Sequence, residues 1–250
     1  MAPVEAMYRK RSGVHNRRWL ARKNDRSFSA DSRPRDACLC QGRPVFLYSR
    51  SMSKSAPAPG IGKKSEPRER LLSTAAEIFY TSGIRTTGVE RIIGAAAVTK
   101  ATFYRHFPSK EDLVLAYLRG ADASIRQRLQ MIARNPDPVE LLRAVGAGIA
   151  EDLCQPGFRG CAFINAGAEY PDPASPVRQL VQEHRAWFHQ YLTDALAKAG
   201  HRRPVSAADH FALMRDGAMV QGYLSDPAAA GDVLKRGIEG VIRTIQAGWD

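Results

Sequence analysis

The chain has 250 residues, 44% of them hydrophobic and 25% charged, with four cysteines and a formal net charge of +12. This length is enough for one large or two smaller domains with hydrophobic cores. Its apolar runs are far shorter than the roughly 18 residues of a membrane span, and no signal-peptide pattern follows the arginine-rich start. We therefore expect a cytoplasmic protein without membrane contact. The cysteines form no CxxC pair and have no histidine at zinc spacing, which predicts reduced thiols and no metal site.

The positive charge is concentrated near the N-terminus. Residues 1–51 contain 12 Lys and Arg against 4 Asp and Glu, whereas residues 119–250 contain 15 of each kind. Residues 1–63 lack hydrophobic periodicity and are rich in Arg, Ser, Pro and Lys, which predicts a disordered basic tail and linker. This tail is either an arm that adds non-specific phosphate contacts or a segment preceding a true translation start at Met52.

A first helix is predicted to begin after the capping residue Ser65 and to end at Gly83, a favourable C-terminal stop. Its apolar residues recur on one face: Leu71, Leu72, Ala75, Ile78 and Phe79. A second helix is predicted from Thr87, because Thr87-Gly88-Val89-Glu90 has the T-x-x-E pattern of a capping box.

A short third helix is predicted from the cap Thr99 to about Phe107, where Pro108 prevents continuation. Ser109 begins a fourth helix. Beyond it, the spacing of apolar residues and of Pro and Gly breaks predicts helices over about 121–134, 137–154, 160–170, 175–199, 206–225 and 230–248. The chain is therefore predicted to be all-α.

Two short helices joined by a tight turn suit the major groove of DNA. Phe103 and Phe107 share a face that would pack on the first helix, which leaves small polar and basic residues on the other faces of the third helix. An ordinary helical hairpin with a solvated polar face would give the same spacing, so the pattern alone leaves both interpretations open.

The stretch Thr86 to Leu113, TTGVERIIGAAAVTKATFYRHFPSKEDL, resembles the DNA-binding domain of the TetR family of bacterial regulators. The match lies in Ala96-Ala97-Val98-Thr99 at the turn, Tyr104-Arg105-His106-Phe107 and Ser109-Lys110-Glu111-Asp112-Leu113. The family's usual turn glycine is Ala97 here. Glycine tolerates a positive φ that costs alanine about 1 kcal/mol, so the turn has either a negative φ or some strain.

The resemblance implies an N-terminal three-helix helix-turn-helix DNA-binding domain at 64–118 and a larger α-helical ligand-binding and dimerisation domain at 119–250. It also implies that the DNA contacts are made by Thr86, Thr87, Thr99, Lys100, Ala101, Thr102, Tyr104, Arg105, His106 and Lys110. The protein would bind a double-stranded DNA operator as a homodimer formed through the helices at about 206–225 and 230–248.

Aromatic residues, methionines and polar residues on the mid-chain helices are candidates for a pocket that binds a small-molecule effector, although core packing is the commoner role of each aromatic. The candidates are Tyr117, Met131, Phe163, Asn165, Glu169, Trp187, Tyr191 and Met214. Cys161 is either a small buried residue or a thiol that senses oxidants or electrophiles, with Arg159 as a nearby positive charge.

The resulting prediction is a ligand-responsive regulator of transcription, by family default a repressor, that binds a near-palindromic operator and needs no cofactor. A non-specific architectural DNA binder is the alternative suggested by the basic tail. An enzyme is not expected, because the chain contains no HExxH, GxSxG or GxGxxG motif.

Overall fold

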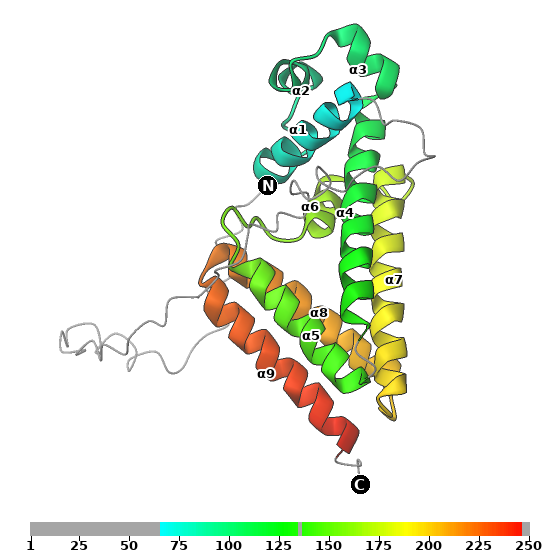
Figure 1. Cartoon of the computed structure of the whole chain (residues 1–250), viewed down its shortest axis with the longest axis vertical. Helices are drawn as coiled ribbons and strands as arrows, with labels where there is room; N and C mark the ends of the chain where they lie inside the picture. The colour runs from blue at the N-terminus through cyan, green and yellow to red at the C-terminus, as the bar shows by residue number, and fades with distance from the viewer. Residues whose placement is uncertain (1–65, 135–136, 247–250) are drawn as a thin grey trace, which may run out of the picture. The chain divides into compact units, whose positions relative to one another are not determined.

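The structure is a computed structural model that describes residues 66–134 and 137–246 (Figure 1). These ranges contain helices and no strand, as predicted. The helices are α1 (Glu66–Ser82), α2 (Val89–Ala96), α3 (Lys100–His106), α4 (Lys110–Ile132), α5 (Pro138–Leu153), α6 (Ala162–Glu169), α7 (Pro176–Lys198), α8 (Pro204–Leu224) and α9 (Pro227–Gln246). The predictions for the basic tail, the Met52 start and the Ser65 cap lie outside the described residues.

The first three helices pack around a small core that also receives the start of α4. Leu71, Ala75 and Phe79 from α1 are buried, as the sequence predicted for one face of this helix. Phe103 is fully buried and Phe107 is 2% exposed, so the shared face of these two aromatics does point inward. The remaining faces of α3 are left for other contacts.

The segment between α1 and α2 differs from the prediction. Gly83 ends α1 with a φ of 89°, as expected, but the capping box at Thr87 does not form. Gly88 occupies the N-cap of α2 without a side-chain hydrogen bond. The hydroxyl of Thr87 is instead buried and donates to the carbonyl of Gly83 at 2.7 Å, because the chain turns back across the end of α1.

The two later caps are confirmed. The Oγ1 of Thr99 accepts a hydrogen bond from the N–H of Thr102 at 3.1 Å, and the Oγ of Ser109 accepts one from the N–H of Asp112 at 3.1 Å. Each bond satisfies an amide that has no partner within its own helix. The starts of α3 and α4 are therefore both specified by local sequence.

Ala97, in the turn between α2 and α3, has the left-handed conformation, with φ 50° and ψ 51°. The N–H of Val98 reaches back to the carbonyl of Ile93 at 3.3 Å, which closes the end of α2. Of the two conformations expected for this turn, it therefore has the strained one, with a positive φ at alanine. No other described non-glycine residue has a positive φ.

Replacing Ala97 with glycine should therefore stabilise the protein by about 1 kcal/mol, because glycine has no Cβ to oppose a positive φ. The free energy of unfolding in urea measures this gain. The neighbouring exposed Ala95 is the matched control, since Ala95→Gly in helical conformation should destabilise by about 0.5–1 kcal/mol. Equal losses from both substitutions would contradict the role assigned to the turn.

Helix α4 runs without a break through the expected domain boundary at 118/119 and joins two segments that the sequence predicted separately. Its buried residues continue on one face, from Leu113 and Tyr117 to Ala121 and Leu129. Gly120 alone does not interrupt the helix, since a glycine costs only about 1 kcal/mol and no proline is present.

The remaining helices form a second core, in which α9 packs on α5 and α8, and α7 packs on α4, α5 and α8. In Figure 1, α4 and α7 run side by side. Within the two helices expected to form the dimer, Phe211, Ile238 and Ile242 are buried inside the chain. No helix in the described ranges is long and apolar enough to cross a membrane.

Candidate DNA-binding surface and ligand cavity

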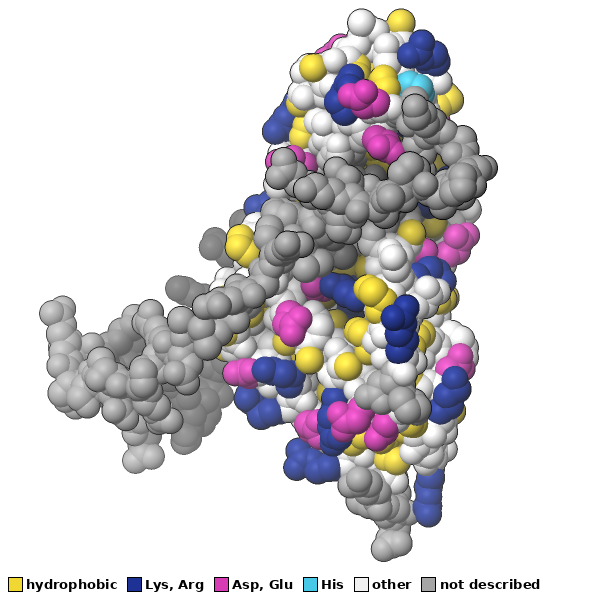
Figure 2. Space-filling model, viewed as in Figure 1, with side chains coloured by type: hydrophobic (Ala, Val, Ile, Leu, Met, Phe, Trp, Pro, Cys, Tyr) yellow, Lys and Arg dark blue, Asp and Glu magenta, His cyan; other side chains and the backbone are white. Residues whose placement is uncertain are grey.

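Helix α3, at the top of the view in Figures 1 and 2, presents most of the predicted DNA-contacting residues on its surface. Ala101, Tyr104 and Arg105 are exposed, and Thr102 and His106 are partly exposed. The Tyr104 ring meets the buried Phe103 ring edge-on, with centroids 5.1 Å apart. Because Phe103 anchors the opposite face of α3, the orientation of these exposed side chains follows from the core.

Polar contacts hold the start of α3 in place. The hydroxyls of Thr99 and Thr102 lie 2.9 Å apart. Lys100 forms a 2.8 Å ion pair with Glu90 of α2, which raises the pKa of Lys100. Both partners are exposed, and such pairs contribute little to stability. Lys100 can therefore exchange Glu90 for a phosphate or a base.

The three predicted DNA contacts that lie before α2 or after α3 differ in their exposure to solvent. Thr86 is exposed, and its hydroxyl donates to the carbonyl of Ser82 at 2.6 Å. Lys110 is partly exposed with its Nζ 3.5 Å from the carbonyl of Arg85, and burial lowers its pKa. Thr87 has no exposed surface, so a phosphate contact by its side chain is excluded in this conformation.

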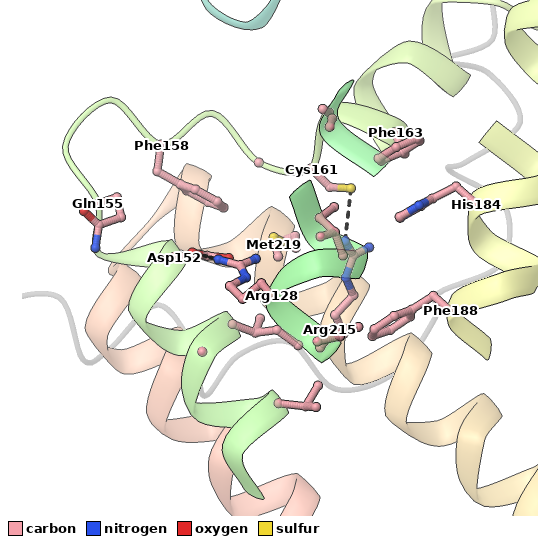
Figure 3. Close-up of a pocket in the computed structure, with 18 of the residues that line it drawn as sticks. Arg128, Asp152, Gln155, Phe158, Cys161, Phe163, His184, Phe188, Arg215 and Met219 are labelled. Carbon is pink, nitrogen blue, oxygen red and sulfur yellow. Dashed lines mark hydrogen bonds and ion pairs between the residues drawn. The ribbon is translucent and has the colours of Figure 1, made fainter. Parts of the chain in front are cut away.

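A cavity of about 70 Å³ lies between α4, α5, α7, α8 and the segment leading into α6 (Figure 3). It exceeds the ~10–15 Å³ that one water molecule requires. Much of its wall is apolar, with Leu129, Ile132, Val145, Ile149, Phe158 and Phe163 among the lining residues. This lining, mostly apolar with a few polar groups, has the composition of a small-molecule site.

Two arginines face the cavity. Arg215 on α8 donates from Nη2 to the Sγ of Cys161 at 3.2 Å and from Nη1 to Asp216 at 2.8 Å. Arg128 on α4 forms a 2.7 Å ion pair with Asp152 on α5. Burial raises the pKa of Asp152, and Arg128 opposes that rise.

His184 contributes an aromatic wall to the cavity. Its ring stacks on Phe163 with centroids 3.6 Å apart, and its Nδ1 lies 2.7 Å from Asp122. Burial lowers the pKa of His184 by more than the contact with Asp122 raises it. Burial therefore favours the neutral form of the ring.

Of the eight residues predicted to bind a ligand, Phe163 alone lines this cavity. Tyr117 is buried against Phe79, Met131 is 54% exposed, and Trp187 lies beneath the guanidinium of Arg126. The other four contact different parts of the chain. Asn165 donates to the carbonyl of Arg159, and Glu169 accepts from the amides of Ile84 and Arg85. Tyr191 donates to the carbonyl of Leu129, and the side chain of Met214 packs against Gly237.

Cys161 is 5% exposed and faces the cavity, but its positively charged neighbour is Arg215 and not the expected Arg159. The guanidinium of Arg159 lies over the ring of Tyr223, 5.0 Å from its centroid. The prediction that Arg159 lies beside the Cys161 thiol is wrong, because the two residues flank a glycine with a φ of 81° that turns the chain. No group of side chains in the described residues is arranged to hold a metal ion.

Two contacts connect the cavity region to the first helices. The hydroxyl of Tyr80 on α1 donates to the carbonyl of Gly160 and accepts from the N–H of Arg159, both at 2.9 Å. The carboxylate of Glu169, at the end of α6, accepts hydrogen bonds from the backbone N–H of Ile84 at 2.9 Å and of Arg85 at 2.6 Å. We call these two contacts the α1–α6 link.

The comparisons with known proteins agree with this architecture. Residues 71–117 match the family of bacterial regulatory proteins described as the tetR family. The crystal structure of SCO4454, a TetR-family transcriptional regulator from Streptomyces coelicolor, is 47% identical, covers 73% of this chain and 97% of its own, and superposes with a TM-score of 0.71.

Two curated Escherichia coli proteins are also similar. The HTH-type transcriptional regulator YjdC is 23% identical over 178 residues, which is 70% of this chain and 93% of that protein. The HTH-type transcriptional repressor NemR is 26% identical over 134 residues, or 52% of this chain and 67% of that protein.

Helix α3 follows a tight turn and buries one of its faces, and the chain continues into a larger helical domain that contains a cavity. This arrangement is that of a helix-turn-helix regulator of transcription. The chain belongs to the TetR family. Members of this family are DNA-binding transcription regulators, generally repressors, and not enzymes.

Proposed function

We propose that the protein is a repressor that binds a near-palindromic operator as a homodimer and is released by a small-molecule effector in the cavity. In this proposal, residues 64–118 bind DNA, and residues 119–250 bind the effector and the second subunit. The observation that carries it is the α1–α6 link, because Gly160 both lines the cavity and accepts the hydrogen bond from Tyr80.

The DNA contacts divide into two groups by side-chain length and position. Thr99, Lys100, Ala101, Thr102 and Arg105 are assigned to bases or the nearby backbone, since α3 enters the major groove. Thr86, Tyr104, His106 and Lys110 are assigned to phosphates. Lys110 also lies at the N-terminus of α4, where the helix dipole favours an anion.

The proposed dimer surface consists of the exposed apolar residues of α8 and α9. Leu213, Val220 and Leu224 are 69%, 44% and 68% exposed and lie at i, i+7 and i+11, on one stripe of α8. Val233 on α9 is 60% exposed. Pairing two copies through these helices would form a four-helix interface and present two α3 helices to successive major grooves about 34 Å apart.

Selection of genomic DNA fragments bound by the purified protein tests this function. We expect recovery of a near-palindromic site that is bound at least about a thousandfold more tightly than random DNA at physiological salt. Equal affinity for both DNAs, with a steep salt dependence, would instead identify a non-specific architectural binder.

Substitutions in α3 separate positioning from sequence discrimination. Tyr104→Ala should weaken binding to the operator and to random DNA alike, because a phosphate contact carries no sequence information. Lys100→Ala and Thr102→Ala should relax discrimination at single base pairs, by about 1–3 kcal/mol each. Competition binding with single-base operator variants measures both effects, and the same loss on every DNA for all three variants would contradict the assignment.

A further inference from the structure

Arg215 is a nearly buried cation with one carboxylate partner, Asp216, and one weaker partner, the sulfur of Cys161. Its side chain is 11% exposed. A guanidinium has five N–H donors, and the sulfur that accepts from Nη2 is a weak acceptor. Figure 3 shows the side chain extending from α8 toward Cys161 and the cavity. A carboxylate oxygen in place of the sulfur would form a much stronger, charge-assisted hydrogen bond.

The charges around the cavity sum to an excess of one positive charge. Asp216 is shared between Arg215 at 2.8 Å and Arg185 at 2.6 Å, so one carboxylate serves two guanidinium groups. Arg128 and Asp152 cancel each other, and burial favours the neutral form of His184. Asp152 is the single acidic residue among the described residues that line the cavity.

The remainder of the site suits an apolar body attached to that anion. The apolar lining includes Leu129 and Ile132 from α4, Val145 and Ile149 from α5, and Phe158 from the segment before α6. A multiply charged ligand would bring more negative charge than the single excess cation can balance. A cationic ligand would place a like charge beside the buried Arg215, which is unfavourable.

We propose that the cavity binds an amphipathic monocarboxylate whose carboxylate accepts hydrogen bonds from Arg215. This inference rests on the proposed effector-responsive function and specifies its ligand class. The incoming carboxylate replaces the Cys161 sulfur at Nη2, and the hydrocarbon part lies against the apolar wall. Cys161 is adjacent to Gly160 in the chain, so displacement of Cys161 also moves Gly160. The carbonyl of Gly160 accepts a hydrogen bond from Tyr80, and occupancy of the cavity is therefore transmitted to α1.

Isothermal titration calorimetry of the full chain with matched acids and amides tests the ligand class. The probes are octanoate and phenylacetate, each compared with its neutral amide. We expect at least one acid to bind, and its amide to bind about ten- to a hundredfold more weakly, since a hydrogen bond to a charged group is lost. Equal affinity of acid and amide, or no binding by either acid, would overturn the proposal.

Variants of Arg215 test the residue. Arg215→Met should weaken acid binding about ten- to a hundredfold and leave the weak amide binding unchanged. Arg215→Lys, which keeps the charge but loses the planar pair of donors, should give an intermediate loss. The exposed Arg243 on α9 provides the matched control, and Arg243→Met should bind acids as the wild type does. Undiminished acid binding by Arg215→Met would exclude this arginine as the anchor.

A parallel measurement of operator release distinguishes the ligand class from the function. Acid binding without operator release supports the carboxylate site and overturns effector response. Release of the operator by a neutral or cationic compound, with no acid binding, supports the function and overturns the carboxylate assignment. If circular dichroism shows that the Arg215→Met variant is unfolded, the acid–amide comparison and the Arg215→Lys variant still test whether the cavity binds a carboxylate through Arg215.

Discussion

Replacing Leu213 with glutamate should leave the protein monomeric and lower its operator affinity at least about a hundredfold, since linked binding to two half-sites is lost. Leu213 is 69% exposed on the α8 stripe, so the substitution does not disturb the core. A charge buried without a partner in an apolar interface opposes association strongly. Sedimentation and operator titration measure the two effects.

Met131→Glu is the matched control for Leu213→Glu. Met131 is also a large exposed apolar residue, 54% exposed, but it lies on α4 and outside the proposed dimer surface. This variant should remain dimeric with wild-type operator affinity. A dimeric Leu213→Glu protein would show that the subunits associate through another surface.

Replacing Glu169 with alanine should destabilise the protein by about 2 kcal/mol, because two backbone amides lose a charged acceptor. The N–H groups of Ile84 and Arg85, which donate to this carboxylate, should also exchange with solvent deuterium at least about tenfold faster. Urea unfolding and amide exchange measure the two effects.

Glu183→Ala is the control for Glu169→Ala. Glu183 is an exposed carboxylate on α7, and its removal should alter neither the unfolding free energy nor the exchange of these two amides. Unchanged exchange in Glu169→Ala would mean that the carboxylate does not hold the turn between α1 and α2. The α1–α6 link would then depend on Tyr80 alone.

Local sequence predicts the parts of the fold that depend on local chemistry. Gly83, Thr99 and Ser109 end or begin helices where expected, because the relevant hydrogen bonds span only a few residues. Thr87 was predicted wrongly because its hydroxyl had two possible partners. The nearby Gly83 carbonyl forms the hydrogen bond, and the expected amide of α2 does not.

The cavity could not be predicted in the same way. Arg128, Asp152, Cys161 and Arg215 come from separate helices and segments, so their meeting depends on tertiary packing. In the sequence, each arginine resembles an ordinary surface residue of an amphipathic helix. Most of the aromatic residues predicted as ligand contacts pack in or against the core, which is their commoner role.

The uninterrupted course of α4 has a mechanical consequence. Its 23 residues span about 34 Å, from Lys110 beside the DNA-binding helices to Ile132 at the cavity. A stiff rod of that length acts as a lever arm: a tilt of about 4° around the cavity end displaces the far end by about 2 Å. In the proposed dimer, a shift of this size would change the spacing of the two α3 helices on DNA.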